Sequence, residues 1–120
     1  MSRAATSVFV YGIYLVFLGL GLLIIPNTFL PIFGLPTTDE VWVRVGAMLL
    51  LILAYYDIQM ARNEVTLFFR LTVHGRASVI LFFAAFVLLD LVQPILLLLG
   101  AVDLLAALWT AWALRSDSQL

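Results

Sequence analysis

The chain alternates between four long apolar blocks and short polar or proline-rich stretches. Each block approaches the length of about 20 mainly apolar residues that a helix needs to cross the hydrocarbon core of a bilayer. Because that core offers no water to backbone N–H and C=O groups, segments that cross it satisfy those groups as helices. The pattern predicts an all-α fold, a transmembrane four-helix bundle in a single domain of residues 1–120, with spans at about 6–25, 40–62, 76–92 and 94–114.

Prolines, glycines and charged residues mark the predicted ends of the spans. Residues 27–38 (NTFLPIFGLPTT) hold too many breakers to cross a membrane and are predicted to form a loop in the lipid interface. Residues 63–75 mix charged and apolar side chains and are predicted to form an interfacial connector before the third span. The same residues also fit a third helix that begins near Val65, and both alternatives stay open.

Small residues lie at helical spacing in the first and last blocks. Gly12 and Gly19 are seven residues apart, so they share one face of the first helix, where a neighbouring helix can approach closely. In the last block the small residues share a face with Asp103, while Trp109 and Trp112 point the other way. We therefore expect Asp103 to point into the bundle.

The composition supports a membrane protein and excludes several kinds of chemistry. Hydrophobic residues make up 65% of the chain and charged residues 11%, against about 45–50% and 25% in soluble domains. The sequence has no cysteine and one histidine, which excludes thiolate chemistry and a multi-histidine metal site. With a net charge of −1, we expect no nucleic-acid partner, and no motif indicates a cofactor.

The arginines predict how the protein lies in a cell membrane. By the positive-inside rule, the side rich in arginine faces the cytoplasm. This places both the N- and C-termini in the cytoplasm. The first block is expected to be a retained span, because it ends in IIPNTFLP and not in a cleavage pattern. Five of the six basic residues fall on one side of the four-span arrangement: Arg3, Arg62, Arg70, Arg76 and Arg115.

Asp103 is the first candidate for a functional residue. It lies about nine residues into the fourth span, roughly 13 Å deep at 1.5 Å per residue. A carboxylate at the centre of a span costs about 2.5–3.5 kcal/mol on insertion scales, so it needs a partner or a wet cavity. Arg44, on the second span, is the predicted partner. The pair would be either a structural ion pair or a site for a ligand or proton.

A second candidate cluster is predicted at the cytoplasmic rim. Asp57 lies about one turn inside Arg62, and His74 and Arg76 are expected to return to the same depth across the connector. Such a cluster could bind a lipid phosphate or relay protons, and the alternative is an ordinary rim of arginines and tyrosines that meet headgroups. Its members are Tyr55, Asp57, Arg62, His74 and Arg76.

Several short segments carry a resemblance to known proteins. Gly19-x-Gly21, the FGLP loop, WVRVGAMLL and VDLL…ALWT together resemble the DoxX-like group of small bacterial four-helix membrane proteins, whose second span often starts with an arginine and a glycine, as Arg44 and Gly46 do here. The resemblance implies a multi-pass inner-membrane protein that works in complexes or as an accessory factor. The chain also has the size of the small multidrug exporters, but its first span lacks the acidic residue on which those proteins rely.

These observations lead to three hypotheses about function. The first is an accessory or assembly subunit without catalytic activity, which docks on other membrane proteins or its own copies through small-residue faces. The alternative is a small transporter or binder of an amphiphile that uses Asp103 and Arg44. The third is a lipid-modifying or isomerising enzyme that uses Asp57, His74 and Tyr55 at the cytoplasmic rim.

Overall fold

The computed structural model describes residues 1–118 and confirms the all-α fold. Four long helices are joined by short turns and one longer loop. Each is long and apolar enough to cross a membrane. A fifth, short helix lies in the longer loop. The helices are α1 (Arg3–Ile24), α2 (Pro26–Ile32), α3 (Trp42–Arg62), α4 (Thr66–Leu88) and α5 (Leu96–Ser118).

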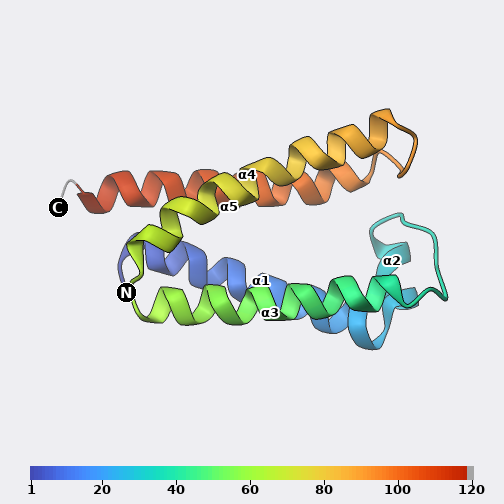
Figure 1. The fold of residues 1–120 in the computed structure, drawn as a ribbon, viewed down its shortest axis with the longest axis horizontal. Coiled ribbons are helices and arrows are strands. Elements are labelled where there is room, and N and C mark those ends of the chain that lie inside the picture. The colour runs from blue at the N-terminus through green and yellow to red at the C-terminus, as the bar shows by residue number, and fades with distance from the viewer. Residues whose placement is uncertain (119–120) are drawn as a thin grey trace.

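The long helices form two antiparallel pairs. Helix α1 packs along α3, and α4 packs along α5 (Figure 1). The pairs meet mainly where α1 contacts α5, whereas α3 and α4 hardly touch beyond the turn that joins them. The molecule is 49 Å long, close to the roughly 40–45 Å of a bilayer with its headgroups. The arrangement leaves one side open between α3 and α4.

The α1–α3 pair is closed by small residues, as the spacing of Gly12 and Gly19 predicts. A Cβ at Gly12 would lie 2.9 Å from Ile58, and one at Gly19 would lie 2.9 Å from Leu51. The facing residues of α3 are small as well, spaced seven apart, and almost fully buried. We call this contact the α1–α3 seam; it is formed by Ala5, Gly12, Gly19, Ala47, Ala54 and Ala61.

The predicted interface loop at residues 27–38 contains a short helix. Pro26 occupies its first turn, where the missing N–H leaves no bond unmade and the fixed φ suits a helix. The ring of Phe29 fills the space beside Gly21 of α1, so α2 folds back on α1. Gly34, with φ of +72°, then takes the left-handed conformation that glycine adopts without strain.

The predicted connector at residues 63–75 is not observed as a separate element. The chain turns tightly at 63–65, where Glu64 has a φ of 54°, and α4 begins at Thr66. The third helix therefore takes the longer of the two alternatives and ends at Leu88 rather than near 92. Arginine is a good helix former and one glycine costs only about 1 kcal/mol, so the polar residues of this segment do not interrupt the helix.

The N-terminus of α1 is tied to both helix pairs. The backbone N–H and hydroxyl of Ser2 donate to the Glu64 carboxylate at 2.6 and 2.7 Å. The backbone N–H of Ala4 donates to Asp117 at 3.0 Å, and the Arg3 guanidinium donates to the Ser116 hydroxyl. The first helical turn thus finds acceptors for N–H groups that have no partner within the helix.

Candidate functional site

Two adjoining cavities lie between the helix pairs. The larger, of about 630 Å³, is lined by all four long helices, and the smaller, of about 380 Å³, runs toward α2 and the start of α5. We call the larger one the groove. Its walls are mainly leucine and phenylalanine, and it holds four polar residues with ionisable side chains. The two cavities share the residues Tyr11, Leu15, Leu50, Phe83 and Asp103.

Arg76 lies in the middle of α4 and lines the groove. It is ten residues beyond Thr66, about 15 Å along the helix, and its side chain is only 4% exposed. Its Nη2 donates to the Thr110 hydroxyl at 2.8 Å, and its Nε donates to the Thr72 carbonyl at 3.3 Å. Within residues 1–118, its Nη1 has no hydrogen-bond partner. A buried donor in this state costs free energy that a ligand would recover.

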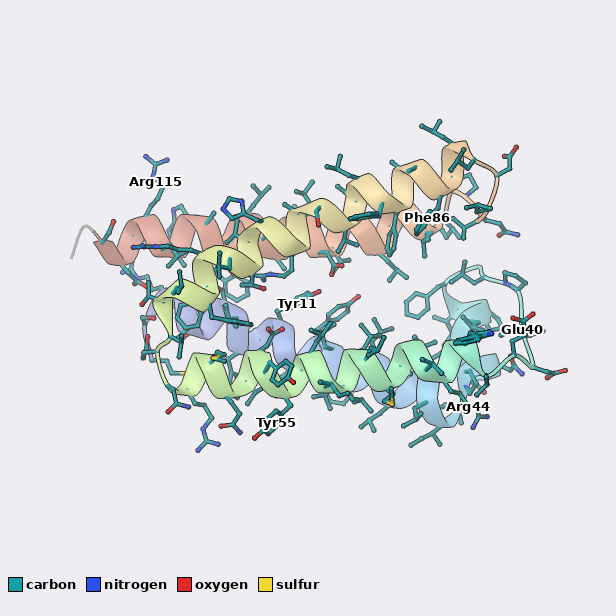
Figure 2. The ribbon with its side chains drawn as sticks, in the orientation of Figure 1. Tyr11, Glu40, Arg44, Tyr55, Phe86 and Arg115 are labelled. Atoms are coloured by element: carbon teal, nitrogen blue, oxygen red, sulfur yellow. The ribbon has the colours of Figure 1, made fainter. Side chains whose placement is uncertain are left out.

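Tyr11 of α1 connects Arg76 to Asp103. The Tyr11 hydroxyl donates to Asp103 Oδ1 at 2.8 Å, and the guanidinium carbon of Arg76 lies 4.8 Å from the centre of the Tyr11 ring. That distance is within the range of a cation–π contact. Figure 2 shows Tyr11 in the space between the two helix pairs. Tyr11 therefore contacts a guanidinium with its ring and a carboxylate with its hydroxyl.

Asp57 lines the groove from α3. It is 5% exposed, and no side chain in the described part of the chain donates a hydrogen bond to its carboxylate. The close approach of α1 at Gly12 holds this part of α3 in place, since a Cβ at Gly12 would lie 3.2 Å from the Cβ of Asp57. The groove thus contains a second ionisable group whose hydrogen-bonding capacity is unused.

The polar residues continue toward the chain termini through Ser7 and Thr110. The two hydroxyls lie 2.7 Å apart, and both residues are fully buried. Ser7 also donates to the Ala4 carbonyl at 2.7 Å. This chain of hydrogen bonds joins α1, α4 and α5, and it fixes the Arg76 side chain on one wall of the groove.

The structure does not place Arg44 beside Asp103. Arg44 is the third residue of α3, is exposed, and lines a separate surface pocket with Tyr55 and Tyr56. In Figure 2 Arg44 lies at the N-terminal end of α3, away from Tyr11. The face of α3 that carries Arg44 is turned away from α5, so Asp103 takes Tyr11 as its partner instead. Asp103 does point into the bundle, as the small-residue face predicts.

The predicted rim cluster is divided between the groove and the outside. Asp57 and Arg76 line the same cavity, whereas Tyr55, Arg62 and His74 are exposed. His74 precedes Arg76 by two residues, and residues two apart point to different sides of a helix. Arg76 is predicted from the sequence to lie with four other arginines on one side of the membrane. Because α4 begins at Thr66, Arg76 lies near the middle of that helix instead.

Sequence reasoning missed Tyr11 and Ser7 as site residues. The sequence does carry a signal for them: Ser7, Tyr11 and Tyr14 follow one another at spacings of four and three, so they share a face of α1. A polar face on an otherwise apolar helix indicates a contact with other polar groups inside a bundle.

The groove suits binding better than metal chemistry. Among residues 1–118 no three His, Cys, Asp or Glu side chains lie close enough to hold a metal ion. The groove instead presents hydrogen-bond donors, carboxylates and apolar walls.

Comparisons with family models, curated proteins and solved structures find no match for this chain, so the resemblance to the DoxX-like group stays an expectation.

Proposed function

We propose that the chain is a multi-pass membrane protein with both termini in the cytoplasm. In support, the start of α1, the end of α5 and the α3–α4 turn lie at one end of the molecule (Figure 1). That end carries four arginines, and the opposite end carries only Arg44, which agrees with the positive-inside rule. The four are Arg3, Arg62, Arg70 and Arg115.

The absence of cysteine from the sequence allows a direct test of this orientation. Single variants Thr37→Cys and Asn63→Cys, at opposite ends, are treated with a membrane-impermeant maleimide in intact cells. We expect labelling at position 37 without permeabilisation and at position 63 only after it. The reverse pattern would overturn the proposed orientation.

We also propose that the protein binds an amphiphilic molecule from the bilayer in the groove. The observation that carries this proposal is Arg76, a buried cation that lines a cavity with apolar walls and whose Nη1 has no hydrogen-bond partner within residues 1–118. A polar head would meet Arg76, and an apolar chain would lie along Leu15, Leu50 and Phe83, which continue into the second cavity. Pockets of this volume and lining are typical of small-molecule sites.

The open side between α3 and α4 supports entry from the lipid. Leu53 and Leu71 line the groove from these two helices and are half or more exposed on the outside of the bundle. An amphiphile could enter there without passing through water, since its chain would exchange lipid contacts for leucine contacts.

Photolabelling tests the proposed binding. The protein, reconstituted in phosphatidylcholine vesicles, is irradiated with a lysophosphatidylethanolamine that carries a diazirine in its chain. We expect labelled peptides from α3 and α4. Gly75 lines the groove, and a Cβ there would meet nothing within 4 Å, so Gly75→Leu should fill the cavity, keep the fold and reduce labelling at least about fivefold.

Ala85→Leu, on the exposed side of α4, serves as the matched control and should keep wild-type labelling. If labelling spreads evenly over the lipid-facing side chains and Gly75→Leu leaves it unchanged, the groove does not bind amphiphiles.

The accessory-subunit hypothesis receives less support from the structure. Its basis is a set of small-residue faces for docking on other proteins, and these faces are used within the chain. Gly12 and Gly19 contact α3, and a Cβ at Gly100 would lie 3.2 Å from the backbone of Ile80 in α4.

A further inference from the structure

Two groups of opposite charge line the groove from different helices. Arg76 belongs to α4 and Asp57 to α3, and both are at least nine-tenths buried. Within residues 1–118 Arg76 has an Nη1 without a partner, and no side chain donates a hydrogen bond to Asp57. Burial of an unpaired charge is costly, yet these two groups do not pair with each other.

Their separation follows from what holds each side chain. Arg76 is bonded to Thr110 and Thr72 and packs on the Tyr11 ring, which keeps it on the α1, α4 and α5 wall. Asp57 is held on α3 by the closed α1–α3 seam. No ion pair joins the two side chains in the part of the chain that the structure describes, so a molecule in the groove can satisfy both groups.

Asp103 does not form an ion pair with Arg76 in place of Asp57. Its Oδ1 accepts the Tyr11 hydroxyl, so part of its capacity is used. With Asp57, Asp103 and Arg76 all ionised, the groove carries one more negative than positive charge. A purely anionic head group would add to this imbalance, and a purely cationic one would leave Nη1 of Arg76 without an acceptor.

We infer that the amphiphile is zwitterionic, with an anionic oxygen that accepts from Arg76 and an ammonium group that donates to Asp57. This inference rests on the proposed amphiphile binding and specifies its ligand. Each contact is a charge-assisted hydrogen bond, the stronger class of hydrogen bond in proteins. The head group bridges α3 and α4, and its chain extends past Tyr11 into the second cavity.

Three diazirine probes with the same chain test this inference in phosphatidylcholine vesicles: a lysophosphatidylethanolamine, a lysophosphatidylglycerol and an alkylamine. We expect the wild-type groove to prefer the zwitterionic probe over each of the others by about tenfold, the effect of losing one charged hydrogen bond. Asp57→Asn should abolish the preference over lysophosphatidylglycerol. Arg76→Gln should abolish the preference over the alkylamine.

Arg70→Gln is the matched control, because Arg70 is an exposed arginine on the same helix, and it should keep the wild-type order of the probes. If Arg76→Gln does not fold, Asp57→Asn alone decides. Equal labelling of the wild-type groove by all three probes, or an unchanged order in Asp57→Asn, would overturn the zwitterionic assignment and leave amphiphile binding standing. Absence of groove labelling by every probe would refute the binding itself.

Discussion

Helix α3 has two very different sides. Toward α1 it presents Ala47 and Ala54 to glycines, and the two helices approach so closely that a single methyl group added at Gly12 or Gly19 would press on side chains of α3. Toward α4 it presents Leu50, Leu53 and Asp57 to a cavity of about 630 Å³. The first side is packed like a protein interior, and the second leaves polar groups unpaired. The comparison separates residues that hold the fold from residues available to a ligand.

The same distinction applies to the charges. Glu64 in the α3–α4 turn and Asp117 near the end of α5 accept hydrogen bonds from the start of α1. Arg76 and Asp57 lie deeper, and each has unused hydrogen-bonding capacity. Costly groups that no local partner satisfies are typical of functional sites in membranes.

The largest expected effect comes from filling the α1–α3 seam. Gly19→Leu would drive a side chain into Leu51 and toward the Ala47 carbonyl, 2.9 and 3.2 Å from the new Cβ. Overpacking of this kind should lower the free energy of unfolding by about 1–3 kcal/mol. Denaturation in detergent micelles, followed by circular dichroism, measures the change.

Gly46→Leu is the matched glycine-to-leucine substitution on α3, outside the seam, because a Cβ at Gly46 meets nothing within 4 Å. Leucine favours helix over glycine by less than about 1 kcal/mol, so this variant should be as stable as wild type or slightly more so. Equal destabilisation by both variants would remove the contrast between the two sides of α3.

A smaller effect on stability is expected when the pH is lowered through the range in which Glu64, in the α3–α4 turn, takes up a proton. The hydrogen bonds from Ser2 lower the pKa of the Glu64 carboxyl below its ordinary value of 4.5. The folded state therefore favours the ionised form. Its stabilising contribution is complete above about pH 5 and is lost as the pH falls through the lowered pKa.

Thermal unfolding between about pH 6 and 3 should show a smaller loss of stability in Glu64→Gln than in wild type, because the variant has no proton to bind at this position. Asp39→Asn, at the other end of the molecule, is the control and should follow the wild-type curve. A wild-type profile in Glu64→Gln would show that the Ser2 hydrogen bonds do not contribute.

The fold could be predicted from the sequence because the apolar pattern of each span extends over many residues, so a few exceptions do not obscure it. The inward direction of Asp103 followed from the glycine and alanine positions around it. The partner of Asp103 could not be derived, since that depends on which helices are neighbours, and α1 proved closer to Asp103 than the start of α3. The position of Arg76 depended on where α4 begins. With a start at Thr66, the residues Thr72, Arg76, Val79 and Phe83 fall on one face by their spacing, and all line the groove.

The hydrogen bond between Arg76 and Thr110 has a consequence for biogenesis. The two residues are 34 positions apart in the chain. If the protein is inserted into a membrane as proposed, α4 reaches the translocon before Thr110 of α5 has left the ribosome. An arginine at mid-helix costs about 2.5–3.5 kcal/mol to insert alone. We therefore expect α4 to stay at the translocon until α5 arrives and the two leave as a hairpin. A chain truncated before α5 should integrate poorly.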